Sequence, residues 1–256
     1  MRFNLSLKCS LHVKAAFLFL SLSSLSFAQN RIYAYEQISD TFGVCLACSV
    51  QNPLNAIGDN ENDYSTLTMG TALLGGVSQT LLFPDATSNT KLVVGIGTNN
   101  IPLTVQLLSG ITIETMNGNT SNDDMKFINS SILKLGGDTP NRATIELQPT
   151  KPYTGVKIRV SGGVLSLGGG FRIYYVFQEP VTFTAFGTAN GQISLNGNVP
   201  VENSQMTITN ISGKEVYRSK INSKNIDLHS PLPEGIYILN LQTKENKTYS
   251  RKIIIK

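Results

Sequence analysis

Two cysteines, Cys45 and Cys48, form a Cys-x-x-Cys arrangement, and their spacing fits three kinds of chemistry. A redox pair needs a reactive thiolate at a helix N-terminus in a βαβ unit, and no such unit surrounds these residues. A zinc site needs two further ligands, but the rest of the chain offers only Cys9 and two distant histidines. In an oxidising compartment the favoured interpretation is therefore a disulfide that closes a small loop.

Three carboxylates follow shortly after the cysteines, in the segment "GDNEND". Asp59, Glu61 and Asp63 alternate along the chain, so they can point toward one hard cation such as Ca²⁺. An EF-hand is excluded, because its loop needs Gly at the sixth position and Glu at the twelfth, where this chain has Tyr64 and Gly70. The alternative is a solvated acidic turn, and the sequence leaves both open.

Residues 1–28 have the pattern of a secretory signal peptide. Basic residues precede a short apolar run, and "SFA" forms a small-x-small cleavage site after Ala28, so the mature chain is expected to begin at Gln29. The run is shorter than the roughly 20 residues that span a bilayer. Export to an oxidising compartment follows, which supports the disulfide. Three of the 21 basic residues lie in this segment, which leaves 18 against 17 acidic ones and no charged block of the kind that binds nucleic acid.

Activated-nucleophile catalysis is disfavoured between residues 29 and 179, because this range contains no histidine. A carboxylate pair that includes Glu114, Asp123 or Asp124 keeps a secreted hydrolase of carbohydrate or protein open as an alternative. Binding is the favoured class. The chain has no Trp, so a sugar-stacking surface would come from Tyr or Phe. The exposed candidates are Tyr33, Tyr35, Tyr64 and Tyr153.

The elements that must position these residues are β-strands. Short alternating or apolar runs are separated by Gly, Asn, Asp, Pro and Ser, which is typical of all-β proteins. The strands expected before residue 180 are 80–83, 91–96, 103–108, 111–116, 132–135, 143–147, 155–160, 164–167 and 171–177. Nine short strands predict a jelly-roll-like sandwich over residues 29–179.

A second β unit is expected over residues 180–256, since Pro180 ends the strongest strand pattern. About seven strands fit a small immunoglobulin-like sandwich there. Its strands are expected at 181–185, 192–195, 205–210, 214–220, 225–228, 235–242 and 248–255.

The end of the chain carries ordered motifs: a Gly-Lys turn, an "IDL" strand, "LPEGIY" and a basic apolar strand at the last residue. The residues that carry them are Gly213, Lys214, Leu232, Pro233, Gly235, Tyr237, Arg251, Lys252 and Lys256. This segment resembles the C-terminal sorting domain of the type IX secretion system of Bacteroidota. One departure is that family members often open with Tyr-Pro-Asn-Pro, where this chain reads "LNGNVPVENSQ".

The resemblance implies a route. The precursor would cross the inner membrane by its signal peptide, fold in the periplasm and be recognised by an outer-membrane translocon. A sortase-like protease would then remove the tail, releasing the protein or joining it to a surface polysaccharide lipid. The alternative is an ordinary immunoglobulin-like terminal domain.

The earlier part of the chain carries a second resemblance. The stretch from Val44 to Pro84 looks like a module of large Bacteroidota surface and adhesin-like proteins, and "NAIGDNENDYSTL" is similar to the early loop of discoidin or galactose-binding-like jelly rolls. The pattern departs where Gly58 and Asp59 exchange the expected order. We therefore predict an exported, non-enzymatic binding or adhesion protein of the cell surface or medium, with glycan as a partner and no cofactor except Ca²⁺.

Overall fold

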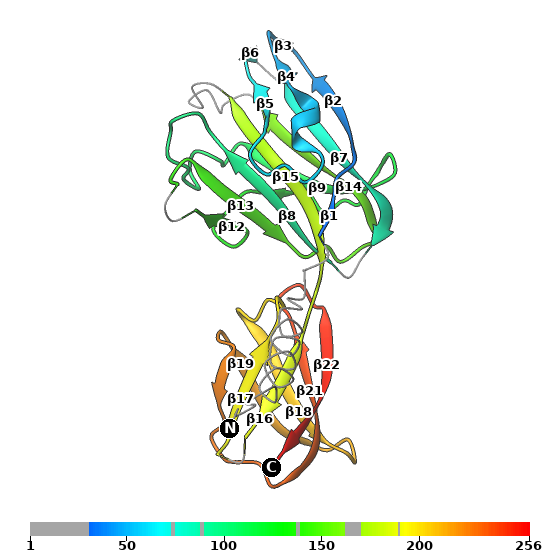
Figure 1. Cartoon of the computed structure of the whole chain (residues 1–256), viewed down its shortest axis with the longest axis vertical. Coiled ribbons are helices and arrows are strands. Elements are labelled where there is room, and N and C mark those ends of the chain that lie inside the picture. The colour runs from blue at the N-terminus through cyan, green and yellow to red at the C-terminus, as the bar shows by residue number, and fades with distance from the viewer. Residues whose placement is uncertain (1–30, 73–74, 88–89, 137–138, 162–169, 189) are drawn as a thin grey trace, which may run out of the picture. The chain divides into compact units, whose positions relative to one another are not determined.

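The computed structural model describes residues 31–72, 75–87, 90–136, 139–161, 170–188 and 190–256 (Figure 1). These residues form strands, turns and a short 3-10 helix, η1 (Pro53–Ala56), which confirms the all-β prediction. No helix in these ranges is long and apolar enough to cross a membrane. The expected signal peptide with Ala28 and Gln29, and the strand expected at 164–167, lie outside the described residues.

The N-terminal sandwich has two antiparallel sheets. The first sheet has the order β12, β13, β8, β15, β5, β4, with β1 paired beside β15. Its strands are β1 (Ile32–Tyr33), β4 (Ser49–Gln51), β5 (Ser65–Thr68), β8 (Thr90–Gly97), β12 (Leu133–Leu135), β13 (Arg142–Leu147) and β15 (Phe171–Pro180).

The second sheet has the order β10, β9, β14, β7, β2, with β11 paired beside β9. Its strands are β2 (Glu36–Phe42), β7 (Gly76–Thr87), β9 (Ile111–Asn117), β10 (Thr120–Ser121), β11 (Lys126–Phe127) and β14 (Tyr153–Ser161). A separate ribbon joins β3 (Cys45–Leu46) to β6 (Thr71–Ala72).

The core lies between these two sheets and follows from alternation along the strands. In β14, Val156, Ile158 and Val160 are fully buried, while Lys157 and Arg159 point to the opposite, outer face. The same period places Leu92, Val94 and Ile96 of β8 in the core. The outer face of each sheet is therefore the surface on which polar and aromatic side chains gather.

The strand expected at 103–108 is wrong. These residues form consecutive turns, in which Leu108 N–H donates to Thr104 O (3.2 Å) and Ser109 N–H donates to Gln106 O (3.3 Å). Leu103 and Leu108 are still buried. A short apolar run indicates that its residues are buried, but it does not by itself distinguish a strand from a packed turn.

The C-terminal sandwich has a sheet of three strands and a sheet of four. The first has the order β16 (Thr184–Gly187), β17 (Gln192–Asn196), β20 (Asn225–Asp227). The second has the order β19 (Glu215–Ile221), β18 (Ser204–Asn210), β21 (Gly235–Gln242), β22 (Thr248–Ile255). Its core is separate from that of the N-terminal sandwich and begins at Phe183. The boundary at 179/180 stays a prediction.

Candidate functional site

A groove of about 440 Å³ lies on the outer face of the second sheet; we call it the outer groove. Its volume falls within the range of small-ligand pockets, roughly 300–1,000 Å³. It is lined by Asp40, Phe42, Ser78, Thr112, Met125, Phe127, Lys157, Arg159 and Ser161.

The floor of the outer groove comes from three neighbouring strands. Arg159 of β14 lies opposite Thr112 of β9 and opposite Ser78 of β7 in the strand register. Directly opposite residues of antiparallel strands point to the same face, so these three side chains share the floor. Asp40 of β2 lies opposite Ser78 and extends the row to the edge of the sheet.

Three charged side chains line the outer groove, those of Lys157, Arg159 and Asp40, and a further carboxylate, that of Glu114, lies beside them. Glu114 is 8% exposed and its carboxylate lies 3.8 Å from the Arg159 guanidinium. Lys157 lies opposite Glu114 in the register, and Asp40 accepts a hydrogen bond from Thr41 N–H (2.8 Å). The two cationic side chains of the groove therefore lie near two carboxylates, of which Asp40 lines the groove and Glu114 lies beside it.

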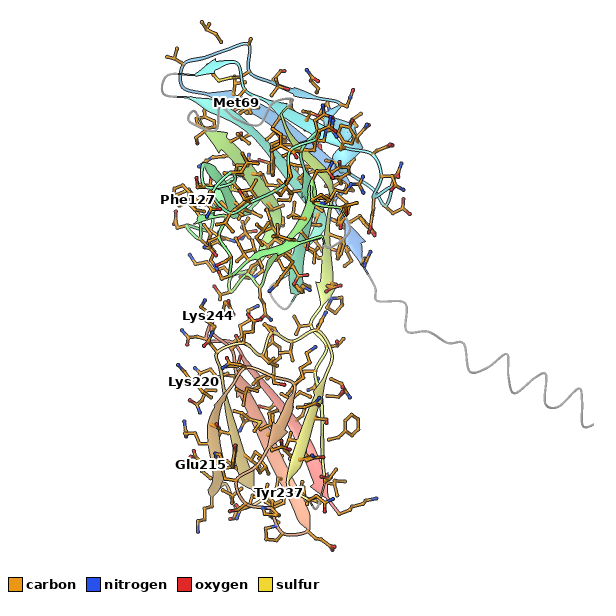
Figure 2. The ribbon with its side chains drawn as sticks, turned by 90° about the vertical axis from the view of Figure 1, so that its left-hand side faces the viewer. Met69, Phe127, Glu215, Lys220, Tyr237 and Lys244 are labelled. Atoms are coloured by element: carbon orange, nitrogen blue, oxygen red, sulfur yellow. A yellow bond between two sulfur atoms is a disulfide. The ribbon has the colours of Figure 1, made fainter. Side chains whose placement is uncertain are left out.

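The walls of the outer groove are apolar. Phe127 is 57% exposed and Met125 is 48% exposed, and Figure 2 shows Phe127 at the surface of the N-terminal sandwich. On the other wall, Phe42 lies opposite Gly76, where an added Cβ would lie 2.6 Å from the Phe42 ring. Gly76 thus gives the Phe42 ring room to lie against the sheet.

The outer face of the first sheet carries a second cluster, in which guanidinium groups stack on aromatic rings. The Cζ of Arg142 lies 3.8 Å from the Tyr174 ring centre, that of Arg172 lies 4.1 Å from Tyr64, and that of Arg31 lies 4.3 Å from Phe177. Such cation–π contacts stabilise by about 0.5–2 kcal/mol each. These rings and guanidinium groups therefore engage one another.

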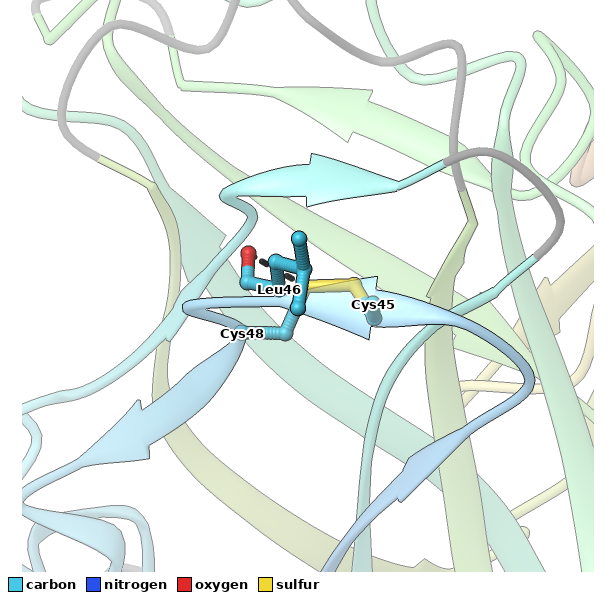
Figure 3. Close-up of a disulfide and its surroundings, with 3 residues drawn as sticks. All are labelled: Cys45, Leu46 and Cys48. Carbon is cyan, nitrogen blue, oxygen red and sulfur yellow. Dashed lines mark hydrogen bonds between the residues drawn. A yellow bond between two sulfur atoms is a disulfide. The ribbon is translucent and has the colours of Figure 1, made fainter.

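The cysteine prediction is confirmed: Cys45 and Cys48 are joined by a disulfide across the turn after β3 (Figure 3). Their Cα atoms lie 5.7 Å apart, within the range usual for disulfides. Ala47, between them, has a φ of 59°, a left-handed conformation that is uncommon for a residue with a side chain. The disulfide therefore holds a tight turn.

Two of the three acidic residues make separate contacts, and the third, Asp59, is exposed. Glu61 accepts hydrogen bonds from Arg31 (2.6 Å) and from the Tyr33 hydroxyl (2.7 Å), and Asp63 accepts one from Asn60 (2.7 Å). Among the described residues, no group of three or more His, Cys, Asp or Glu is placed to share a metal ion. Calcium binding at Asp59, Glu61 and Asp63 stays a prediction.

The tyrosines chosen as exposed candidates have different environments. Tyr35 is 57% exposed, whereas Tyr33 and Tyr64 are half-buried beside Phe177 and Tyr174. The prediction for Tyr153 is wrong, because its side chain is fully buried and its hydroxyl lies 2.9 Å from that of Thr90. Burial raises the pKa of Tyr153 well above its usual value.

Sequence reasoning missed the outer groove. Its residues come from β2, β7, β9, β11, β14 and neighbouring turns, so no local motif joins them. The one local signal was "MKFIN", in which Met125 and Phe127 stand on the same side of a short polar strand.

The residues of the tail motifs lie in turns and strands of the C-terminal sandwich. Gly213 has a φ of 82° in the turn before β19, a backbone conformation that favours glycine. Tyr237 is 7% exposed, and its hydroxyl donates to the carbonyl oxygen of Pro233 (2.9 Å), which ties the "LPEGIY" turn to β21. Leu232 packs against the core of the C-terminal sandwich, to which Tyr237 also belongs.

The last strand, β22, pairs with β21 from Gly235–Ile255 to Gln242–Thr248. Arg251 donates a hydrogen bond to the carbonyl oxygen of Phe183 (2.5 Å), while Lys252 and Lys256 are exposed. The basic end of the chain is therefore an ordered strand that presents lysines at the surface.

The architecture defines an all-β protein made of two antiparallel sandwiches. Residues 188–256 match the family described as "Secretion system C-terminal sorting domain". The end of the chain is thus a type IX sorting domain, which implies interaction with secretion machinery and export to the cell surface or the medium. No curated protein matches the chain.

Solved structures give weak likenesses. One is a family 32 carbohydrate-binding module from C. perfringens NanJ in complex with galactose, at 15% identity and a TM-score of 0.34, covering 58% of this chain and 98% of that one. Another is the xylan-binding module CBM86 from Roseburia intestinalis, at 8% identity and a TM-score of 0.32, covering 57% and 96%. A third is the adhesin domain of Epf from Streptococcus pyogenes, at 14% identity and a TM-score of 0.24, covering 88% and 91%. These scores carry no argument about function.

Proposed function

We propose that this is an exported, non-enzymatic glycan-binding protein of the cell surface or medium, in which the N-terminal sandwich binds and the C-terminal sandwich directs export. The observation that carries the binding role is the exposed Phe127 beside the polar floor of the outer groove. An exposed ring next to hydrogen-bonding side chains offers what a sugar needs, an apolar surface for its C–H groups and polar partners for its hydroxyls.

The proposed route begins with cleavage of the signal peptide between Ala28 and Gln29 and continues through the periplasm. The outer-membrane type IX translocon then recognises the sorting domain, and a sortase-like protease removes it, as in Bacteroidota. The match at residues 188–256 supports this route. Adhesion to a glycan of another cell or of the surrounding matrix is the role proposed for the delivered sandwich.

A hydrolase would need two free carboxylates that face each other across a substrate. The acids considered from the sequence have structural partners instead. Asp124 accepts hydrogen bonds from the Thr115 amide (2.8 Å) and hydroxyl (2.6 Å), and Glu114 accepts one from the Ser121 hydroxyl. These contacts support binding over hydrolysis.

The test is a glycan array probed with the full chain, while release of reducing sugar is measured in parallel. We expect binding without release, and loss of binding in Phe127→Ala. The matched control is Phe186→Ala, because Phe186 is 60% exposed but belongs to β16 of the C-terminal sandwich. Sugar release that is lost in Glu114→Gln would overturn the non-enzymatic assignment, and no binding to any glycan would overturn the binding role.

A further inference from the structure

We infer that the outer groove binds an uncharged sugar ring, with the C–H face of the ring on Phe127 and the ring hydroxyls on the floor. This inference rests on the proposed function and names its ligand class and its residues. Three features of the groove support it: the unpaired polar groups on the floor, the carboxylates close to its cations and the position of its rings.

The floor holds polar groups that no described protein group engages. The hydroxyls of Ser78 and Thr112 and the amine of Lys157 make no hydrogen bond or ion pair with any residue that the structure describes. Ser78 and Thr112 are nearly buried, yet both line the groove. Buried polar groups normally have partners, so these groups are free to bond to a ligand.

The floor also offers hydrogen bonds in both directions. Lys157 and Arg159 can only donate, the Asp40 carboxylate can only accept, and the Ser78 and Thr112 hydroxyls can do both. A sugar hydroxyl is itself both donor and acceptor. Neighbouring hydroxyls of one sugar ring can therefore bond to a cation on one side and to a carboxylate on the other. A simple anion would leave the Asp40 carboxylate without a donor, and an apolar ligand would leave all the polar groups of the floor without partners.

The charge balance selects against acidic ligands. The positive charges of Lys157 and Arg159 are matched by the carboxylates of Asp40 and Glu114 on the same face. A carboxylate or sulfate group would gain attraction from the cations but would meet repulsion from Asp40 at the edge of the floor. An uncharged ring avoids that repulsion and uses all the polar groups.

The walls supply the apolar contact. Phe127 and Met125 stand on the β11 side, and Phe42 lies against Gly76 on the β2 side. Half-exposed aromatic rings at a groove contribute a large contact area with few rotatable bonds, which lowers the entropic cost of binding.

The experiment uses the full chain and pairs of oligosaccharides of one linkage that differ only at C6, as hydroxymethyl or carboxylate. We expect the neutral member to bind more tightly, and Phe127→Ala to lose about tenfold in affinity, as expected for a central aromatic contact. Phe186→Ala should leave binding unchanged. Melting temperatures of all variants are compared first, so that a folding defect is recognised.

Asp40→Asn gives a second, independent readout, because it keeps the side chain's shape and removes one negative charge. We expect weaker binding of the neutral member and stronger binding of the acidic one. Tighter binding of the acidic member by the unmodified chain, or full binding by Phe127→Ala, would overturn the inference and leave glycan binding intact. Binding of neither type, in this assay and on the array, would overturn the proposed function itself.

Discussion

Gly95 of β8 lies directly against the ring of Tyr175 of β15. The two residues are opposite each other in the strand register, and a methyl carbon at Gly95 would lie 2.8 Å from Cδ1 of Tyr175 and closer still to Cε1 and Cζ. The ring therefore lies flat on the outer face of the first sheet, stacked 5.6 Å from Phe177. Glycine in a strand often marks such a close approach.

Gly95→Ala should therefore destabilise the N-terminal sandwich by about 1–3 kcal/mol, the usual cost of overpacking. In a Tyr175→Ala background the same substitution should cost no more than about 0.5 kcal/mol, because the added methyl group then has room. Urea unfolding of the four proteins of this cycle measures the difference. Equal costs in both backgrounds would show that the destabilisation does not come from a clash between the added methyl group and the Tyr175 ring.

Strand pairing explains what the sequence could and could not predict. Alternating or apolar runs predict β8, β13 and β14 to within two residues at either end and β15 to within three, because burial along a strand is reflected in the local sequence. β2 was missed, because "EQISDTF" is largely polar and lies at the edge of a sheet.

The outer groove could not be predicted, because the order of strands across a sheet is not a local property. Asp40 and Ser78 are 38 positions apart in the chain and are brought together only when β2 pairs with β7. The prediction that Tyr153 is exposed is wrong for a related reason. It follows the polar segment "PTKP", but the strand that it begins, β14, lies between β7 and β9 and places the ring in the core.

Tyr153→Phe should lower the free energy of unfolding by about 1–2 kcal/mol at neutral pH, because the nearly buried Thr90 hydroxyl loses its partner. Burial also raises the pKa of Tyr153 in the folded protein, so the folded state holds this proton more tightly than the unfolded chain does. The resulting stability is fully present below about pH 10, the ordinary tyrosine value, and is lost as the pH rises above it.

We therefore expect the unfolding free energy of the unmodified protein to fall above about pH 10, and to fall less steeply in Tyr153→Phe. Burial raises the pKa values of Tyr33 and Tyr175 too, so part of the slope should remain. Tyr35→Phe is the control, since Tyr35 is 57% exposed. Identical slopes in all three proteins would contradict the assignment to Tyr153.

The Cys45–Cys48 disulfide should protect both thiols from labelling unless the protein is first reduced. Because it closes a loop of only four residues, its loss in Cys45→Ser/Cys48→Ser should cost no more than about 2 kcal/mol in the chain-entropy estimate. Mass spectrometry after alkylation checks the first point and urea unfolding the second. Alkylation of either cysteine without reduction would refute the disulfide in the exported protein.

Deletion of residues 251–256 should leave the precursor in the periplasm, because it removes the basic strand that the sorting domain presents. It also removes Ile253 and Ile255, which are each 2% exposed in the C-terminal core. The N-terminal core contains none of these residues, so unfolding of the N-terminal sandwich should be unchanged. Cell fractionation with surface proteolysis measures delivery, and normal surface delivery of the truncated chain would reject the sorting role.

Calcium binding at Asp59, Glu61 and Asp63 can be tested by replacing Arg31, which pairs with Glu61. In the structure Glu61 accepts hydrogen bonds from Arg31 and Tyr33, so an ion that used Glu61 would have to compete with the guanidinium. Arg31→Gln removes that competition and leaves the three carboxylates in place. An ion that binds only the folded state raises the melting temperature by mass action. If the loop binds calcium, the rise in melting temperature between EDTA and excess calcium should be larger in Arg31→Gln than in the unmodified chain. No calcium-dependent shift in either protein would identify the segment as a solvated acidic turn, whose Glu61 pairs with Arg31, the residue before β1.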